Sequence, residues 1–463
     1  MNDEKKDLVK IKCVNTNEYK EVPIGSSLEQ LIAVFGVKMP YLIANAKVNN
    51  KTESLAYKVY RPRTVEYVDI SNSSAMRTYV RSLCFILAKA VDDVLPDAEV
   101  HIEHAVAKGY YFQIHGEAPV GEKELDAVRN RMRDIVQADL PFIQVEDETE
   151  NVVKLFRERR MEDKALLLET ADLVYSRYFK LGEYIDYFYG CLTPSTGYIS
   201  LFDIRPYNGG FLLRVPKREN PVELEPFIQQ DKLLNVYREH LSFLKISKLD
   251  NVGDLNKAKQ DDRMSEVIQV AEAYQSKQIA HIAEEITKKF HEGVRLVLIS
   301  GPSSSGKTTF RKRLEIQLFV NLLRPIGLSL DNYFIEREHT PLDEFGEKDY
   351  ESLYALDLEL FEQHLITLMN GYEVELPFYN FVTGKRDFKN NFLKMDESSL
   401  LIVEGIHGLN PELTAHIPRD KKFMVYVSAL TSISLDNHNW IPASDNRLLR
   451  RIVRDYRYRG YSA

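Results

Sequence analysis

The sequence predicts a multidomain protein of the α/β and α+β classes, whose C-terminal part is a doubly wound parallel sheet. At 463 residues, the chain is long enough for about three domains. The apolar run 294–299 is typical of a buried parallel strand, and the glycine- and serine-rich segment 301–308 follows it directly. Phe310, Leu314 and Leu318 then recur every four positions, as on one face of a helix. Strand, loop and helix in this order indicate an α/β unit.

Composition and charge exclude several classes of protein. Hydrophobic residues make up 44% of the chain and charged residues 28%, as in ordinary globular proteins. No apolar run approaches the ~18 residues of a membrane-spanning helix, and the charged N-terminus does not resemble a signal peptide. Cys13, Cys84 and Cys191 lack metal-ligand spacing and fit a reducing compartment. The net charge of −8 argues against broad affinity for nucleic acid. We therefore expect a cytoplasmic protein with no membrane partner.

The loop after the predicted strand is a complete G-x-x-x-x-G-K-[ST] motif. Such a loop aims backbone N–H groups and a helix N-terminus at phosphate, which the glycines allow to come close. Lys307 is expected to reach the β- and γ-phosphates and Thr308 to offer its hydroxyl to Mg²⁺. The alternative is a glycine-serine turn with an unrelated lysine. The expected nucleotide-binding residues are Gly301, Ser303, Ser304, Ser305, Gly306, Lys307, Thr308 and Thr309.

A carboxylate follows the next predicted strand, 326–330. Ligands gather at the carboxyl ends of parallel strands, so Asp331 is placed to accept a hydroxyl proton or to fix Mg²⁺ through water. The alternative is a helix-capping Asp. A GTPase is disfavoured because the nearest [NT]-K-x-D-like segment, 247–250, precedes the loop and no D-x-x-G follows it.

The first 70 residues alternate strand-like runs with one helix. Strands are predicted at 8–14 and 19–22, and Gly25-Ser26-Ser27 precedes a helix from Leu28 to Phe35 that stops at Gly36. Further runs at 46–51 and 64–68 complete the pattern. This order, and residues 22–31 in particular, resembles a TGS domain, which implies a β-grasp fold.

The next block resembles the second domain of threonyl-tRNA synthetases. The resemblance covers roughly residues 5–240 and is strongest at 184–197, which is similar to the signature V-D-L-C-R-G-P-H-V-P-S-T-G. Editing in that family needs a Cys and a His in this signature and a helical H-x-x-x-H pair. These positions match Phe188, Leu192, Arg81 and Phe85 here. Phe and Leu neither ligate metal nor pass protons, so the resemblance implies an editing scaffold without its chemistry. Nearby, His101 and His104 are expected on opposite faces of a strand.

The back half resembles the uridine kinase branch of the P-loop kinases, related to phosphoribulokinase. Six segments carry the resemblance in the family's order: the loop 301–309, S-L-D-N-Y at 329–333, D-Y-E-S-L-Y-A-L-D at 349–357, P-F-Y-N-F-V-T-G-K-R at 377–386, I-V-E-G-I at 402–406, and the arginine-rich segment 445–455. The resemblance implies ATP- and Mg²⁺-dependent transfer of a phosphoryl group to a ribose 5′-hydroxyl.

The same resemblance implies roles for individual residues. Asp331 would be the general base, Glu404 would stand beside Mg²⁺ with Thr308 and Asp331, and Lys307 would act in catalysis. The expected substrate-binding residues are Glu351, Tyr379, Arg386 and Arg459. Spacing independently places Arg447, Arg450, Arg451 and Arg454 on one helical face, suited to stabilising a transferring phosphoryl group. Arg451 and Arg454 are the expected catalytic members, and an RNA-binding patch is the alternative.

Two departures from the family pattern bear on the substrate. The family's base-reading His falls on Gly384, so the acceptor is open between a pyrimidine nucleoside and another hydroxylated metabolite. An insert at 432–444, with Asn437, His438, Asn439 and Trp440, is a candidate for a replacement contact.

The predicted organisation has four parts. They are a TGS-like domain at 1–72, a synthetase-like domain at 73–244, a helical connector at 245–293 and a kinase domain at 294–463, expected to be C-terminally incomplete. We expect a small-molecule substrate and a homo-oligomer. RNA stays open as a partner, because an ATP-controlled, RNA-associated sensor is the alternative function.

Overall fold

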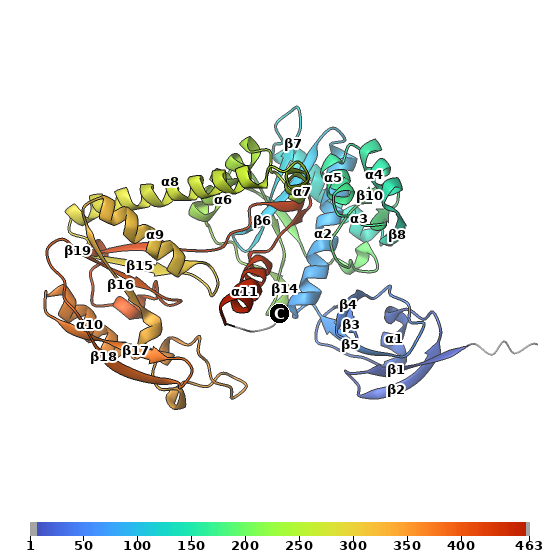
Figure 1. Cartoon of the computed structure of the whole chain (residues 1–463). Coiled ribbons are helices and arrows are strands. Elements are labelled where there is room, and N and C mark those ends of the chain that lie inside the picture. The colour runs from blue at the N-terminus through green and yellow to red at the C-terminus, as the bar shows by residue number, and fades with distance from the viewer. Residues whose placement is uncertain (1–6, 460–463) are drawn as a thin grey trace, which may run out of the picture. The chain divides into compact units, whose positions relative to one another are not determined.

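The computed structural model describes residues 7–459, with the side chains of residues 458 and 459 excepted, and divides them into two compact units (Figure 1). The first unit combines the chain up to Arg263 with the segment Thr431–Pro442. The second combines Met264–Leu430 with the chain from Ala443 onward. The boundaries of the four predicted parts stay a prediction; the division between the two units falls within the predicted connector 245–293, after Arg263.

The first unit begins with a mixed five-stranded sheet crossed by one helix. The strand order is β2-β1-β5-β3-β4, with β1 parallel to β5 and the other pairs antiparallel. Helix α1 buries Leu28, Leu31 and Phe35 against the sheet, as the β-grasp prediction requires. The elements are β1 (Leu8–Cys13), β2 (Glu18–Pro23), α1 (Leu28–Phe35), β3 (Ile43–Val48), β4 (Lys51–Ser54) and β5 (Arg63–Asp69).

The start and end of helix α1 follow from local sequence chemistry. The Ser27 side chain accepts a hydrogen bond from the Gln30 amide, and the Gln30 side chain accepts one from the Ser27 amide. This reciprocal capping box satisfies two amides that the helix itself leaves unpaired. Gly36, at φ +64°, then ends the helix in the left-handed conformation that glycine adopts without steric cost.

The remainder of the first unit is an α+β arrangement around helix α2 (Ser73–Val94), whose residues are mostly buried. It carries a four-stranded sheet of order β11-β12-β7-β6 and a three-stranded sheet of order β10-β9-β8. The strands are β6 (Glu99–Val106), β7 (Gly109–His115), β8 (Ile143–Glu148), β9 (Tyr175–Leu181), β10 (Tyr184–Asp186), β11 (Asp203–Tyr207), β12 (Gly210–Arg214), β13 (Pro216–Lys217) and β14 (Asn220–Leu224). The other helices are α3 (Glu122–Gln137), α4 (Thr149–Glu158), α5 (Glu162–Glu169), α6 (Asp231–Ile246) and α7 (Val252–Gln260).

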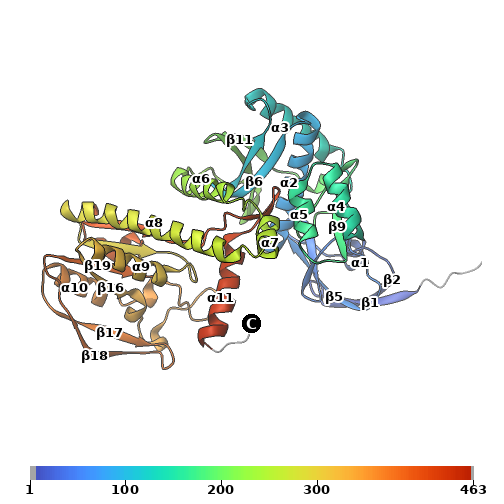
Figure 2. The same ribbon diagram turned by 45° about the horizontal axis from the view of Figure 1, so that its top comes forward.

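The second unit is built on a parallel four-stranded sheet of order β16-β19-β15-β20. The two central strands, β15 and β19, are buried along their whole length, which explains their apolar sequences. Helices α8 and α9 cover one face and α10 the other, so the sheet is doubly wound as predicted (Figure 2). The elements are α8 (Met264–His291), β15 (Leu296–Ser300), α9 (Lys307–Val320), β16 (Arg324–Ser329), α10 (Leu358–Met369), β17 (Val374–Asn380), β18 (Lys385–Leu393), β19 (Ser399–Glu404), β20 (Lys422–Tyr426) and α11 (Ala443–Arg459).

Candidate active site

The loop between β15 and α9 is a cradle that suits phosphate. Gly306 has φ +101°, which glycine tolerates, and α9 begins at the next residue with its amides open. A Cβ added to Gly301 would lie 2.0 Å from the Val427 carbonyl oxygen, so this position has no room for a side chain. The loop is therefore held close to strand β20 and presents the N-terminus of α9.

Two hydroxyl groups of this loop lack hydrogen-bond partners. The side-chain oxygens of Ser304 and Ser305 are buried, and neither has a partner among the residues that the structure describes. Buried polar atoms in native proteins are nearly always paired. Two such oxygens beside an open helix N-terminus fit the oxygens of a bound triphosphate. The chemistry of the loop therefore agrees with the predicted nucleotide site.

Lys307 and two carboxylates face the same cavity, of about 830 Å³. The Lys307 ammonium donates to the carbonyls of Gly301 (2.9 Å) and Pro302 (3.2 Å). Burial lowers the pKa of Lys307, and the negative charges of Glu404 and Asp331 oppose this shift. The ammonium thus lies within electrostatic reach of both predicted acids.

The two acids occupy one edge of the sheet because their strands are neighbours. Glu404 ends β19 in register with Ser329, which ends β16 two residues before Asp331. Buried Glu404 accepts a hydrogen bond from the Thr308 hydroxyl, at 2.9 and 3.1 Å from its two oxygens, and lies 3.5 Å from the Arg311 guanidinium. Asp331 is exposed and lines the cavity. Hydroxyl and carboxylate oxygens suit Mg²⁺, so Thr308 and Glu404 form a fitting pair of ligands.

Helix α11 supplies the positive charge. Arg450, Arg451 and Arg454 line the cavity, and the Arg450 Nε donates to the Ser304 carbonyl at 3.2 Å. Arg447 and Arg451 also line an adjoining cavity of about 470 Å³ together with Glu351. The structure thus brings the arginines chosen by their spacing to one place beside the phosphate loop.

Of the predicted substrate-binding residues whose side chains the structure describes, only Glu351 lines the cavity. Glu351 lines both cavities. Tyr379 is buried beneath Phe334 and Phe381, with ring centroids 5.5 and 5.0 Å away, and is not among the residues that line the cavity. Arg386 pairs instead with Asp357 at 2.6 Å. The expectation that the Tyr379 side chain lines the pocket is therefore wrong. The side chain of Arg459 lies outside the described residues.

Sequence reasoning missed several residues of the cavity wall. Phe334, Tyr350 and Phe381 form its aromatic part. His407 lines the adjoining cavity and lies 2.9 Å from the Glu351 carbonyl through its Nε2. Each of these residues lies within or just beyond a motif used for the prediction, so proximity to the motifs was the available signal.

The insert is part of the first unit. Asn437, His438 and Asn439 pack within the first unit, where His438 Nδ1 lies 2.7 Å from the Asp186 carboxylate. Trp440 packs there against Tyr110, with ring centroids 4.6 Å apart. These side chains are engaged inside the first unit, and a replacement contact to a base stays a prediction.

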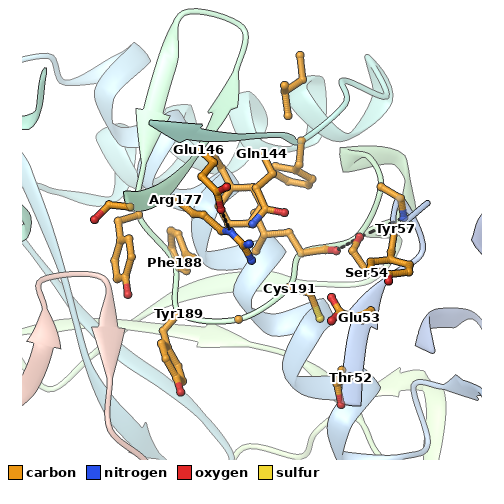
Figure 3. Close-up of a pocket in the computed structure, with 18 of the residues that line it drawn as sticks. Thr52, Glu53, Ser54, Tyr57, Gln144, Glu146, Arg177, Phe188, Tyr189 and Cys191 are labelled. Carbon is orange, nitrogen blue, oxygen red and sulfur yellow. Dashed lines mark hydrogen bonds and ion pairs between the residues drawn. The ribbon is translucent and has the colours of Figure 1, made fainter. Parts of the chain in front are cut away.

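The first unit has a cavity of its own, of about 790 Å³, between strand β4, strands β8 and β9, and the segment 187–193 (Figure 3). Phe188 and Leu192, which stand at the editing Cys and His positions, are almost fully buried and belong to the hydrophobic core. Phe85, at a helical editing position, packs on Phe188 with ring centroids 5.4 Å apart. Among the described residues, no group of three or more His, Cys, Asp or Glu is arranged to hold a metal ion.

A doubly wound parallel sheet with a phosphate loop, two acids at one edge and an arginine-rich helix beside them is the arrangement of the P-loop kinases. Residues 296–463 match the model of the "Phosphoribulokinase / Uridine kinase family". The predicted resemblance of the back half is thereby confirmed, and the family match supports a phosphotransferase.

The front half matches threonine–tRNA ligases. The chain is 28% identical over 194 residues to the enzyme of Syntrophomonas wolfei and 24% identical over 194 residues to that of Symbiobacterium thermophilum. Each match covers 42% of this chain, and the chain spans about 30% of the length of these relatives. A possible uridine kinase from Bacillus stearothermophilus is similar at 23% identity and TM-score 0.27, over 36% of this chain and 90% of that one. In residues 7–459, no helix has the length and apolar character needed to cross a membrane.

Proposed function

We propose that this protein is an ATP- and Mg²⁺-dependent kinase that phosphorylates the ribose 5′-hydroxyl of a nucleoside. The observation that carries the proposal is the single cavity shared by Lys307, Thr308, Asp331 and Glu404, with the arginines of α11 on its wall. Phosphoryl transfer depends mainly on positioning and on stabilising charge. A loop that binds phosphate, a second acid on the cavity wall, and a basic helix supply these requirements.

Each residue has a defined part in this proposal. The phosphate loop and Lys307 would hold the triphosphate, and Thr308 and Glu404 would hold Mg²⁺, which supplies charge neutralisation when bound. Asp331 would accept the proton of the acceptor hydroxyl while that oxygen forms its bond to phosphorus. Arg450, Arg451 and Arg454 would stabilise charge on the transferring group, and Glu351 would bind hydroxyls of the acceptor.

The residues of the cavity define the chemistry of phosphoryl transfer more closely than they define the molecule that accepts the phosphoryl group. Gly384, which stands at the base-reading His position, has φ +71°, and an added Cβ would lie 2.7 Å from the Cβ of Arg337. No side chain from position 384 therefore reads a base. This observation favours a second candidate, a kinase of the same mechanism acting on another small hydroxylated metabolite.

The test is Asp331→Ala in the full chain. We expect kcat to fall by about 10²–10⁴-fold, because the general base is lost, while affinity for ATP stays nearly unchanged. The measurement is ADP release across a panel of nucleosides and other hydroxylated metabolites, with ATP binding measured by calorimetry. Asp387→Asn, on the exposed face of β18 and outside the cavity, is the control and should retain full activity.

The outcomes separate the candidates. Turnover restricted to nucleosides supports the proposal, and turnover of another metabolite alone supports the second candidate. Normal cellular function of Asp331→Ala, with RNA recovered alongside the protein, would instead favour an ATP-controlled, RNA-associated role.

A further inference from the structure

Arg311 lies against the acid assigned to Mg²⁺ but does not face the cavity. It belongs to α9, four residues after Lys307, and is not among the residues that line the cavity. Its Nε is buried, has no hydrogen-bond partner among the residues that the structure describes, and lies 3.5 Å from Glu404 Oε1. Buried N–H groups without a partner are rare in native proteins. Arg311 is thus a buried charged group beside the site that the proposed mechanism does not use.

The Glu404 carboxylate needs more support than Thr308 gives. Glu404 is 5% exposed, and the Thr308 hydroxyl lies 2.9 Å from its Oε1 and 3.1 Å from its Oε2. A hydroxyl has one proton and donates to one oxygen at a time. Burying an ionised carboxylate is costly unless a cation or further donors compensate it. The positive charge of Arg311 beside Oε1 supplies such compensation and leaves Oε2 as the freer oxygen.

Glu315 anchors the Arg311 guanidinium. Its Oε1 accepts a hydrogen bond from Arg311 Nη1, one helical turn away. Both side chains are largely buried, with 16% of Arg311 and 20% of Glu315 exposed. The spacing of four residues on α9 places them on one face of the helix. The guanidinium is planar, so fixing Nη1 on Glu315 also fixes the direction of Nε toward Glu404.

Gly327 provides the space for this pair. It lies in β16, and Glu404 is in register with Ser329 two positions further along, so Gly327 and Glu404 face the same side of the sheet. A Cβ added to Gly327 would overlap Arg311 Nη1 and Glu315 Oε1 and would lie 2.8 Å from Arg311 Cζ. The φ of Gly327 is not positive, and glycine inside a strand generally lowers stability. Space, rather than backbone conformation, therefore explains this glycine.

We propose that Arg311 is a positioning residue for Glu404: its guanidinium, anchored by Glu315 and admitted by Gly327, fixes the carboxylate in the orientation that binds Mg²⁺. All four residues lie in the second unit. The inference deepens the proposed function and rests on it, because that function assigns Glu404 to Mg²⁺. Partners that orient a metal ligand typically contribute about 10–100-fold to metal affinity. A positive charge that acted through electrostatics alone would repel Mg²⁺, so its removal would tighten metal binding. The two roles therefore predict opposite signs.

The first test measures how much Mg²⁺ strengthens binding of a non-hydrolysable ATP analogue to the full chain, by calorimetry in saturating MgCl₂ and again in EDTA. In Arg311→Met, affinity in EDTA should stay nearly unchanged, because the phosphate loop is intact, while the gain from Mg²⁺ should fall about tenfold or more. Arg311→Lys keeps the charge but not the planar pair of donors, so it should recover little of the gain. Arg313→Met is the control: Arg313 lies on the same helix but pairs with Glu272 at 2.7 Å, and this variant should keep the wild-type gain.

The second test reaches the same pair through Gly327, which is not among the residues that line the cavity. Gly327→Ala should reduce the Mg²⁺ gain, because the added methyl displaces Arg311 Nη1 and Glu315 Oε1. It should have little further effect in Arg311→Met, where the shorter side chain leaves room for the methyl. A double-mutant cycle measures this non-additivity, and equal effects in both backgrounds would contradict the inference. Gly327→Ala and Arg311→Lys decide the question if Arg311→Met does not fold.

Neither test needs turnover, so failure of this inference and failure of the proposed function can be told apart. An unchanged or larger Mg²⁺ gain in Arg311→Met would refute the positioning role even if the protein phosphorylates nucleosides. A reduced gain in a protein that phosphorylates no nucleoside would retain the positioning role and reject the proposed reaction. A wild type in which Mg²⁺ gives no gain would refute the positioning role together with the assignment of Glu404 to the metal.

Discussion

Gly384 shows how one residue can change both a turn and a specificity. It closes the loop between β17 and β18, where its amide donates to the Asn380 carbonyl at 2.7 Å and its carbonyl accepts from the Arg337 amide at 2.9 Å. Its positive φ suits glycine, and Arg337 fills the space that a side chain would need. Restoring a histidine here would therefore strain the turn before it restored a contact to a base.

We expect Gly384→Ala to lower the free energy of unfolding by about 1–2 kcal/mol through the left-handed backbone, with a further cost from the clash with Arg337. Gly371→Ala is a matched control, because Gly371 has φ +79° but its nearest contact to an added Cβ is 4.0 Å. Adding Arg337→Ala should relieve part of the Gly384→Ala cost and none of the Gly371→Ala cost. Chemical denaturation of the four variants measures this, and equal costs with and without Arg337 would contradict it.

At the scale of elements, strand β6 carries an unusual polar face against helix α6. His104 stacks on Tyr237 with ring centroids 3.5 Å apart, and the neighbouring Glu103 is mostly buried. His101 lies on the opposite face of the strand, as predicted. Burial raises the pKa of Glu103 to about 7, with the Arg238 charge opposing it, and burial lowers the pKa of His104 to about 3.

This packing predicts a pH dependence of stability. Unfolded Glu103 loses its proton near pH 4.5, but the folded form keeps it up to about 7, so unfolding releases a proton in this window. The contribution of Glu103 to stability therefore falls as pH rises from about 4.5 to 7, whereas that of His104, which gains a proton on unfolding, rises with pH up to its ordinary pKa of 6.5. Glu103→Gln should remove this loss and gain about 2–3 kcal/mol relative to wild type between pH 4.5 and 8. The measurement is denaturant unfolding of both proteins across this range, and parallel pH profiles would contradict the prediction.

For the whole molecule, the front half keeps the synthetase-like fold but packs apolar side chains at three of the four editing positions. Phe85, Phe188 and Leu192 are all buried in one core. Neither metal binding nor proton transfer is available from such groups.

We expect the protein to release the amino acid from mischarged tRNA no faster than buffer alone does. The reason is that phenylalanine and leucine stand at positions whose side chains activate water in the editing synthetases. The measurement is release of the amino acid from mischarged tRNA, with an editing-competent threonyl-tRNA synthetase as the positive control. Deacylation above background by the purified protein would contradict this prediction.

Sequence patterns within short segments correctly indicated those features of the site that depend on neighbouring residues alone. The phosphate loop follows from its motif, Glu404 and Asp331 from their places after apolar strands, and the arginine face of α11 from its helical spacing. The docking of the insert was beyond such reasoning, because His438 and its partner Asp186 are 252 residues apart and no periodicity links them. Tyr379 was misplaced for a related reason: the order in which Phe334, Phe381 and Tyr379 stack is decided by tertiary packing.

The buried ammonium of Lys164 has a consequence for folding during translation. Its partner Asp436 is synthesised 272 residues later, a delay of roughly 15–50 s at 5–20 residues per second. Throughout that interval the nascent N-terminal segment must keep this lysine hydrated or only partly neutralised. The complete cluster around Lys164 can therefore form only after translation has passed residue 436, so a late segment of the chain takes part in the maturation of an earlier one.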